Sequence, residues 1–507
     1  MADHNKILIR NARLYDHDGD TDQPSVGDVL IEDGRIAQLA TTIDDAGAQV
    51  IDARDKLLIP GFVNAHYHSH DILLRGCFEN LPTEMWFMYA LPPVYPQRSA
   101  KEVRARTMLA AAEAIHNGVT TVQDMLTILP FDSELLDVAL ETYDASGLRV
   151  VFAQQIADLR ALDRVPYWRE CVPEASHHLL AAAADSGTVA SDPVDVVTEE
   201  YLARRGQHDR ITWALGPTNP LLCSPDMMRR LAALSVEHDL PVFMHFYQSR
   251  AEAVASRHLM QDYDGSLIPL LEEVGLLNER LALAHSIWTS DHEIVALAKA
   301  EATVLLNLAS NMKSKGGVPP VRDFVDAGVR LALGSDNSGC SDSQNMFQQM
   351  KLFTSLAAVS EPEPGPPTAA DAMRYATLGG ARAMGLEGEI GAIRAGMKAD
   401  LVLLDLHSTS FTPLNSAARQ MVFTESGSAV DTVLIDGRVV MEDRKLTTID
   451  EHTLRAAVED VMPGLRRDIE MVAARNADIA PFLLAAYRKT WDDDVGMNRY
   501  LERNQVS

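Results

Sequence analysis

Short segments at both ends of the chain show the mixture of apolar and polar positions that is typical of β-strands. They cover residues 6–10, 29–32, 35–39 and 56–59 near the N-terminus, and 399–404, 430–436 and 438–442 toward the C-terminus. Asp33-Gly34 and Asp436-Gly437 each join two such segments, and an Asp-Gly pair favours a two-residue hairpin turn. The pattern predicts one small β-sandwich domain, formed from both chain ends by residues 1–60 plus 396–450.

Between these ends, apolar strand segments alternate with amphipathic helical segments. Helical spacing of apolar residues is clear in 100–117, 225–238 and 291–299. Eight strand segments occur, at 63–68, 120–125, 149–154, 211–215, 241–245, 281–285, 303–307 and 329–334. This alternation predicts the α/β class and a (β/α)8 TIM barrel over residues 61–395, in which catalytic side chains lie at the carboxyl ends of the strands.

The chain becomes helical after residue 451. Residues 453–461, 465–476 and 479–490 have apolar positions at helical spacing. We interpret residues 451–507 as a helical C-terminal extension that packs on the barrel or on a neighbouring subunit, and we expect a homodimer or a higher homo-oligomer. The sequence does not indicate a function for this extension.

Composition narrows the range of partners. The chain has 507 residues and a net charge of −27, which argues against nucleic acid and against an anionic membrane surface. Its four cysteines show no CxxC motif and no disulfide-framework spacing. The N-terminal residues lack the layout of a signal peptide, and no apolar run reaches the ~20 residues that span a bilayer. We expect a cytoplasmic protein that acts on a small molecule.

Five residues of metal-binding type follow apolar runs at the ends of predicted strands: His66, His68, His245, His285 and Asp336. In an extended strand, His66 and His68 point to the same face. A single histidine at a strand end is usually a hydrogen-bonded structural residue, but these five together predict a metal site. Imidazoles with one carboxylate suit Zn²⁺ or Fe²⁺ better than Mg²⁺ or Ca²⁺. Such a metal lowers the pKa of a bound water toward ~7, and Asp336 is the expected acceptor of its proton.

Residues 60–68, PGFVNAHYH, resemble the first-strand signature of the amidohydrolase superfamily. More narrowly, they resemble the branch that holds cytosine, guanine and S-adenosylhomocysteine deaminases and the s-triazine hydrolases. The similarity extends to about residue 445 and includes GAIRAGMKAD at 391–400, which looks like the return into the β-sandwich. The resemblance implies that His285 orients the attacking water and contacts the metal.

The resemblance also bears on the number of metals. Relatives with two metals commonly bridge them with a carboxylated lysine on the fourth barrel strand. No lysine occurs here between Lys101 and Lys299. We therefore expect one divalent metal per chain, Zn or alternatively Fe.

The sequence departs from the resembled deaminases at Gln248. After the histidine of the fifth strand they carry His-x-x-Glu, whose glutamate moves protons to the ring nitrogen and the leaving group. This chain has His245-Phe246-Tyr247-Gln248, and an amide does not titrate near neutral pH. We expect Gln248 to orient the substrate. We consider Glu252 as a substitute for the glutamate but prefer to interpret it as a solvated residue of a helix's first turn.

Further candidates for substrate binding follow other predicted strands: Trp86, Gln154, Asn219, Asn311 and Asn337. Trp86 either stacks on a flat ring or packs a long loop. His70 and Asp71 lie just past the first histidine pair, and we place them beside the metal rather than on it. We interpret the remaining helix and loop histidines as surface groups, namely His116, His177, His178, His208, His258 and His292.

Three functions are compatible with these residues. The first is a metal-dependent hydrolase that uses activated water to attack an sp² carbon of a small N-heterocycle, in deamination or dechlorination. The alternative is hydrolysis of an amide, urea or carbamate C–N bond. The presence of Gln248 favours this alternative, and it also favours release of a halide. The third, a non-catalytic scaffold, has the least support because every ligand position is present.

Overall fold

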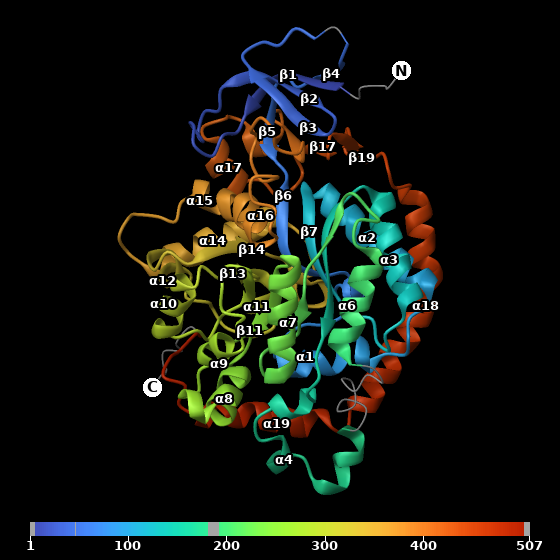
Figure 1. The fold of residues 1–507 in the computed structure, drawn as a ribbon, viewed down its shortest axis with the longest axis vertical. Helices are drawn as coiled ribbons and strands as arrows, with labels where there is room; N and C mark the ends of the chain where they lie inside the picture. Colours follow the sequence, from blue (N-terminus) through green and yellow to red (C-terminus); the bar gives the residue numbers. More distant parts are fainter. Residues whose placement is uncertain (1–5, 46, 181–191, 501–507) are drawn as a thin grey trace.

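A closed barrel of parallel strands, surrounded by helices, forms the centre of the molecule (Figure 1). The computed structural model describes residues 6–45, 47–180 and 192–500. The barrel strands are β6 (Phe62–His68), β7 (Val119–Leu126), β8 (Arg149–Ile156), β9 (Ile211–Trp213) with β10 (Gly216–Pro217), β11 (Val242–Phe246), β12 (Leu281–His285), β13 (Thr303–Leu306) and β14 (Arg330–Leu333) with β15 (Asp336–Asn337). All eight expected strand positions are occupied, in a mixed α/β fold of the TIM-barrel type.

Two links close the barrel. Leu215 and Val242 form a parallel bridge that joins the β9–β10 segment to β11, and β15 pairs with β6. Next to β15, the side chain of Asn64 donates to Ser335 Oγ at 2.8 Å and accepts from the Ser335 N–H at 2.9 Å. Gly334 must be glycine, because a Cβ there would lie 2.4 Å from Asn307 Oδ1. These contacts bring the end of the last strand against the first.

The helices around the barrel begin at polar caps that the sequence supplies. In α7 the side chain of Ser224 accepts from the Met227 N–H, and in α10 Ser290 and Glu293 form a capping box. The described helices before the extension are α1 (Thr83–Ala90), α2 (Ala100–His116), α3 (Ser133–Ser146), α4 (Trp168–Cys171), α6 (Pro193–Arg204), α7 (Pro225–His238), α8 (Arg250–Leu259), α9 (Ile268–Glu273), α10 (Asp291–Lys299), α11 (Leu308–Lys313), α12 (Val321–Asp326), α13 (Ser338–Ser341), α14 (Met346–Ser360), α15 (Ala369–Arg374), α16 (Gly380–Ala383) and α17 (Ala417–Phe423).

Strands from both chain ends form one nine-stranded sheet, and its two halves meet where β16 pairs with β5. Its strands are β1 (Lys6–Leu14), β2 (Val26–Glu32), β3 (Arg35–Ala40), β4 (Gln49–Asp52), β5 (Lys56–Pro60), β16 (Leu401–Asp405), β17 (Val430–Ile435), β18 (Arg438–Glu442) and β19 (Lys445–Leu446). The Asp-Gly turns have positive φ at both residues, and a Cβ on Gly437 would lie 2.7 Å from Gly34 Cα. The two predicted hairpins therefore pack directly on each other.

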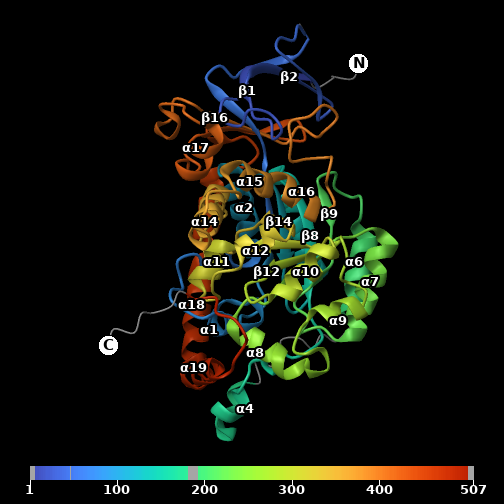
Figure 2. The same cartoon turned by 90° about the vertical axis from the view of Figure 1, so that its left-hand side faces the viewer.

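The C-terminal extension consists of α18 (Glu451–Asn476) and α19 (Ala480–Lys489). We expected separate helices on either side of residues 462–464, but α18 continues through Pro463. Its buried residues Leu454, Leu465 and Val472 share one stripe at helical spacing, and packing of that stripe favours a single helix. The two views agree that α18 runs along the side of the barrel and that α19 crosses the end opposite the sheet (Figures 1 and 2).

Replacing Asn64 tests the barrel closure. Asn64→Ala leaves the N–H and hydroxyl of Ser335 buried without this partner, so we expect a loss of about 1–3 kcal/mol in the free energy of unfolding. Urea unfolding measures it, with the exposed Asn415→Ala as control. Equal stability of the two variants would contradict the role of this contact.

Candidate active site

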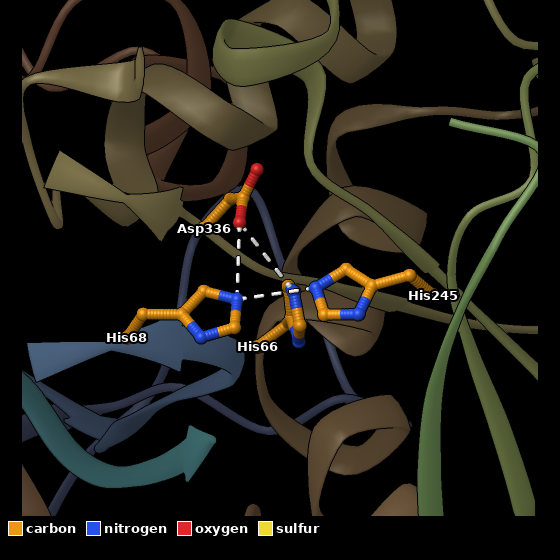
Figure 3. Close-up of side chains that lie close together, drawn as sticks. All are labelled: His66, His68, His245 and Asp336. Carbon is orange, nitrogen blue, oxygen red and sulfur yellow. Dashed lines mark hydrogen bonds and ion pairs between the residues drawn. The ribbon is translucent and has the colours of Figure 1, made fainter. Parts of the chain in front are cut away.

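Four side chains that could hold a metal converge at the carboxyl ends of the barrel strands: His66 and His68 from β6, His245 from β11 and Asp336 from β15 (Figure 3). All four are buried, and one ligand atom from each lies within 4.8 Å of those of the others. The sequence spacing placed the pair on β6 on one face; the barrel brings the other two to the same point.

The hydrogen bonds of two histidines fix which ring nitrogen faces the site. His68 Nδ1 lies 2.7 Å from the carbonyl oxygen of Met125, and His245 Nδ1 lies 2.7 Å from that of Thr218. A carbonyl only accepts, so each Nδ1 carries the proton and each Nε2 presents a lone pair. The two Nε2 atoms are 3.2 Å apart. Two lone pairs facing each other at this distance suit a shared cation, and the donor set of imidazoles with one carboxylate fits zinc.

The charge states also suit a metal. Burial lowers the pKa of His66 to about 4 and that of His245 well below its usual value, so both rings are neutral. Burial acts to raise the pKa of Asp336, but the neighbouring His285, His66 and His68 outweigh it and hold that pKa well below the usual range. Asp336 Oδ1 lies 3.5 Å from His66 Nε2 and 3.4 Å from His68 Nε2. Burial also acts to lower the pKa of His68, but the adjacent Asp336 carboxylate outweighs it and raises that pKa above the usual value, so the neutral rings are those of His66 and His245.

His285 stands beside this cluster rather than within it. Its Nδ1 lies 2.7 Å from Asn311 Oδ1, and its Nε2 lies 3.8 Å from Asp336 Oδ2, which also accepts from the Ser310 hydroxyl. His285 has a φ of 76° and Asp336 a φ of 64°. Such backbone strain in non-glycine residues is characteristic of functional sites, and here it affects the two groups that face each other.

A cavity of about 990 Å³, with its open mouth included, adjoins the histidines. His68, His245, Gln248 and Asn337 line its inner end, together with His70. The side chain of Gln248 thus faces the same space as two of the ligand-type residues.

The expectation for Glu252 was wrong, because this residue is buried rather than solvated. It is 4% exposed, and its carboxylate accepts from the backbone N–H groups of Tyr247 and Gln248, each at 2.9 Å. Asn219 Nδ2 donates to it as well, at 2.5 Å. Glu252 therefore holds the turn that carries Gln248.

The other substrate-binding candidates have different surroundings. Trp86 is buried and donates its indole N–H to the Gly339 carbonyl. It does not line the histidine cavity, whereas Phe87 and Met88 of the same helix do. Gln154 lines a neighbouring cavity, while Gln155 lines both. Asn219 hydrogen-bonds to Glu252, and Asn311 hydrogen-bonds to His285. Neither lines the histidine cavity. Of the five candidates, Asn337 lines the histidine cavity.

Sequence reasoning missed two charged residues of the cavity wall, Glu84 and Arg164. Glu84 Oε1 accepts from the Ser249 hydroxyl, Oε2 has no hydrogen-bond partner among the described residues, and burial raises the pKa of this carboxyl. Glu84 is the one charged residue in the helix TEMWFMYA, and a single carboxyl in an otherwise uncharged helix could have marked it as a candidate functional residue. The Arg164 guanidinium lies over the Phe87 ring, 4.5 Å from its centre, and had no comparable signal.

Asp71 shapes the site from outside. Its carboxylate accepts from the backbone N–H groups of Ser338 and Gly339, at 3.0 and 2.7 Å, and burial raises its pKa to about 6. The carboxylate thereby fixes the turn after Asn337. His70, the residue before Asp71, lines the cavity. His292 of α10, which we expected at the surface, is exposed.

Comparisons with known proteins place this architecture in a family. A sequence model of the amidohydrolase family matches residues 57–440, and the chain belongs to that family. It is 31% identical over 450 residues to a 5'-deoxyadenosine deaminase from Methanothermobacter thermautotrophicus, covering 89% of this chain and 96% of that protein. It is also 31% identical over 424 residues to a 5-methylthioadenosine/S-adenosylhomocysteine deaminase from Pyrococcus abyssi, covering 84% and 91% respectively.

Solved structures show the same fold. An adenosine deaminase from Xanthomonas campestris with bound zinc has a TM-score of 0.79 and 25% identity, over 91% of this chain and 99% of that one. An atrazine chlorohydrolase from Arthrobacter aurescens, complexed with zinc, has a TM-score of 0.75 and 22% identity, over 90% and 100%. Together with the four-residue site, family membership defines the protein as a hydrolase of the amidohydrolase type with a site that could hold a metal, which favours an enzyme over the scaffold alternative.

Metal analysis tests the site directly. We expect purified protein to hold close to one zinc or iron per chain by mass spectrometry. Loss of a residue that only hydrogen-bonds to a metal ligand typically weakens metal binding by roughly 10–100-fold. His245→Ala removes a ligand itself, so it should weaken metal binding by more than that. His292→Ala, on the exposed surface of α10, serves as the control. Two tightly held metals per chain, both needed for activity, would contradict the single site.

Proposed function

We propose that this enzyme removes an amino or chloro substituent from a small N-heterocycle by hydrolysis. The observation that carries the proposal is the cluster of His66, His68, His245 and Asp336 at the inner end of a cavity wide enough for such a ring. The relatives named above for adenosine-type substrates support a purine-like ring, and the chlorohydrolase fold makes an s-triazine the second ring to test.

We infer a single zinc per chain, with iron as the alternative, held by His66, His68, His245 and Asp336. When bound, the metal lowers the pKa of water so that hydroxide is available at neutral pH. Support comes from the facing Nε2 atoms and from the zinc in two solved relatives. A bridging lysine is excluded by sequence, because none lies between Lys101 and Lys299.

Asp336 divides its two oxygens between two tasks in this proposal. Oδ1 faces the histidines, and Oδ2 accepts from Ser310 and lies 3.8 Å from His285 Nε2. We assign to Asp336 the removal of the proton from the attacking water, and to His285, whose Nε2 can accept a hydrogen bond, the orientation of that water. Asn311 keeps His285 in the tautomer whose Nε2 faces the site.

Gln248 is assigned to the substrate. It lines the cavity, and Glu252 fixes its backbone, so its amide can donate to and accept from the edge of a heterocycle. Because the amide does not titrate, the proton for the leaving group comes from another group, with Asp336 as the first choice. The same feature favours the second candidate, hydrolysis of an amide, urea or carbamate C–N bond.

We also propose the domain organisation that the sequence predicts. We infer a β-sandwich from residues 1–60 plus 396–450, a barrel from 61–395 and a helical extension from 451–507, supported by the sheet built from both chain ends. No described helix is long and apolar enough to cross a membrane. The homo-oligomeric state and the cytoplasmic location stay predictions.

Asp336→Asn tests the assigned proton acceptor. The variant should keep its fold and part of its metal through the histidines, but lose activity by several orders of magnitude. The assay is release of ammonia from 5'-deoxyadenosine and S-adenosylhomocysteine and of chloride from atrazine, with ureas and carbamates as the second set. Asp291→Asn, on the surface of α10, is the control. Near wild-type turnover in a metallated, folded variant would remove Asp336 from the mechanism.

Two variants test Gln248. Gln248→Ala should raise KM or lower kcat/KM by roughly 10- to 100-fold without changing metal content, because it removes a positioning contact. Gln248→Glu supplies a titratable carboxyl and should improve ammonia release from an amino-substituted ring. Gln261→Ala, in an exposed turn, is the control. If neither variant changes any kinetic constant, Gln248 is outside the active site.

A further inference from the structure

The C-terminal extension contributes a wall to the catalytic cavity. Leu483 of α19 lines the same cavity as His68 and His245. This helix lies beyond residue 440, where the match to the family ends. This part of the wall therefore lies outside the residues that the family model matches.

Two hydrogen bonds connect the extension to another wall of the cavity. Asn476 Nδ2 donates to the carbonyl oxygen of Met88 at 2.5 Å, and Arg475 Nη1 donates to that of Val94 at 3.2 Å. Met88 and Val94 both line the cavity. The end of α18 thus fixes the backbone at two positions of the cavity lining.

The extension is equally tied to the loop that follows β8. Tyr167 donates its hydroxyl proton to Asp493 at 2.7 Å, and Lys489 pairs with Glu170. This loop also contributes Leu162 and Val165 to the cavity. Leu483 packs in one apolar cluster with Leu162, and Val165 packs against that cluster. The extension therefore joins separate segments around the mouth of the barrel.

Polar and apolar groups are separated within the cavity. The histidines, Gln155, Gln248 and Asn337 provide polar atoms at the inner end. Between α1, the loop after β8 and α19, the lining is mostly apolar: Phe87, Met88, Leu162, Val165 and Leu483. The charged exceptions, Glu84 and Arg164, share a small adjoining cavity with Gln248.

We propose that α19, through Leu483, determines specificity by binding an apolar substituent on the heterocycle. The inference rests on the proposed function, which places the ring at the histidines. With the ring there, a substituent directed toward the mouth meets Met88, Leu162 and Leu483. An alkyl or thioalkyl group gains affinity by leaving water in such surroundings, and a charged group does not.

The test uses 9-alkyladenines from methyl to hexyl with zinc-loaded, full-length protein in calorimetric titrations. Affinity of the wild type should rise with chain length, by up to about fourfold per buried methylene. Leu483→Trp should fill the space and lower hexyl affinity by roughly tenfold, with less than a twofold change for methyl. Leu483→Ala should reduce the gain with chain length. Leu484→Ala, a neighbouring leucine of α19 outside the cavity lining, should behave as wild type.

Each outcome decides a different claim. Circular dichroism and metal content show that the variants are folded and loaded. If Leu483 variants keep the wild-type dependence on chain length, or change methyl and hexyl equally, the specificity role is wrong. Absence of binding across the series also overturns it. Chain-length-dependent binding without ammonia release would instead refute the proposed deamination, and it would still support the binding of the alkyl substituent by Leu483.

Discussion

The repulsion between two imidazole lone pairs is the constraint around which this structure is arranged. Carbonyl oxygens of Met125 and Thr218 fix the tautomers of His68 and His245, and their Nε2 atoms face each other at 3.2 Å. Without a cation this arrangement is unfavourable, and with one it becomes a binding site. A rigid framework is needed to hold such groups together, and the closed barrel provides it.

The framework acts through contacts that carry no chemistry of their own. Asn64 and Ser335 join the last strand to the first, which brings Asp336 beside the histidines of β6. Glu252 fixes the turn of Gln248, and Asn311 fixes the ring of His285. Each of these polar groups is buried, so each hydrogen bond must be made, and the same requirement that stabilises the fold also orients the site.

The cavity has a different origin from the metal site. Its polar inner end comes from barrel strands that belong to the family, whereas part of its outer wall comes from α19. The extension is attached through apolar packing of α18 and α19, through backbone carbonyls and through an ion pair. The polar inner end and the apolar outer wall of the cavity therefore come from different parts of the chain.

Local patterns determined the strands, the Asp-Gly hairpins and the strand-end positions of His66, His68, His245, His285 and Asp336, because periodicity and strand-end position are properties of short segments. Only the closed barrel decided that four of these five residues meet in one cluster. Tertiary structure alone decided the burial of Glu252, the placement of Trp86 in the core and the unbroken course of α18 through Pro463. It also decided that Leu483 reaches the cavity. These outcomes depend on which distant segments meet, and no local pattern contains that information.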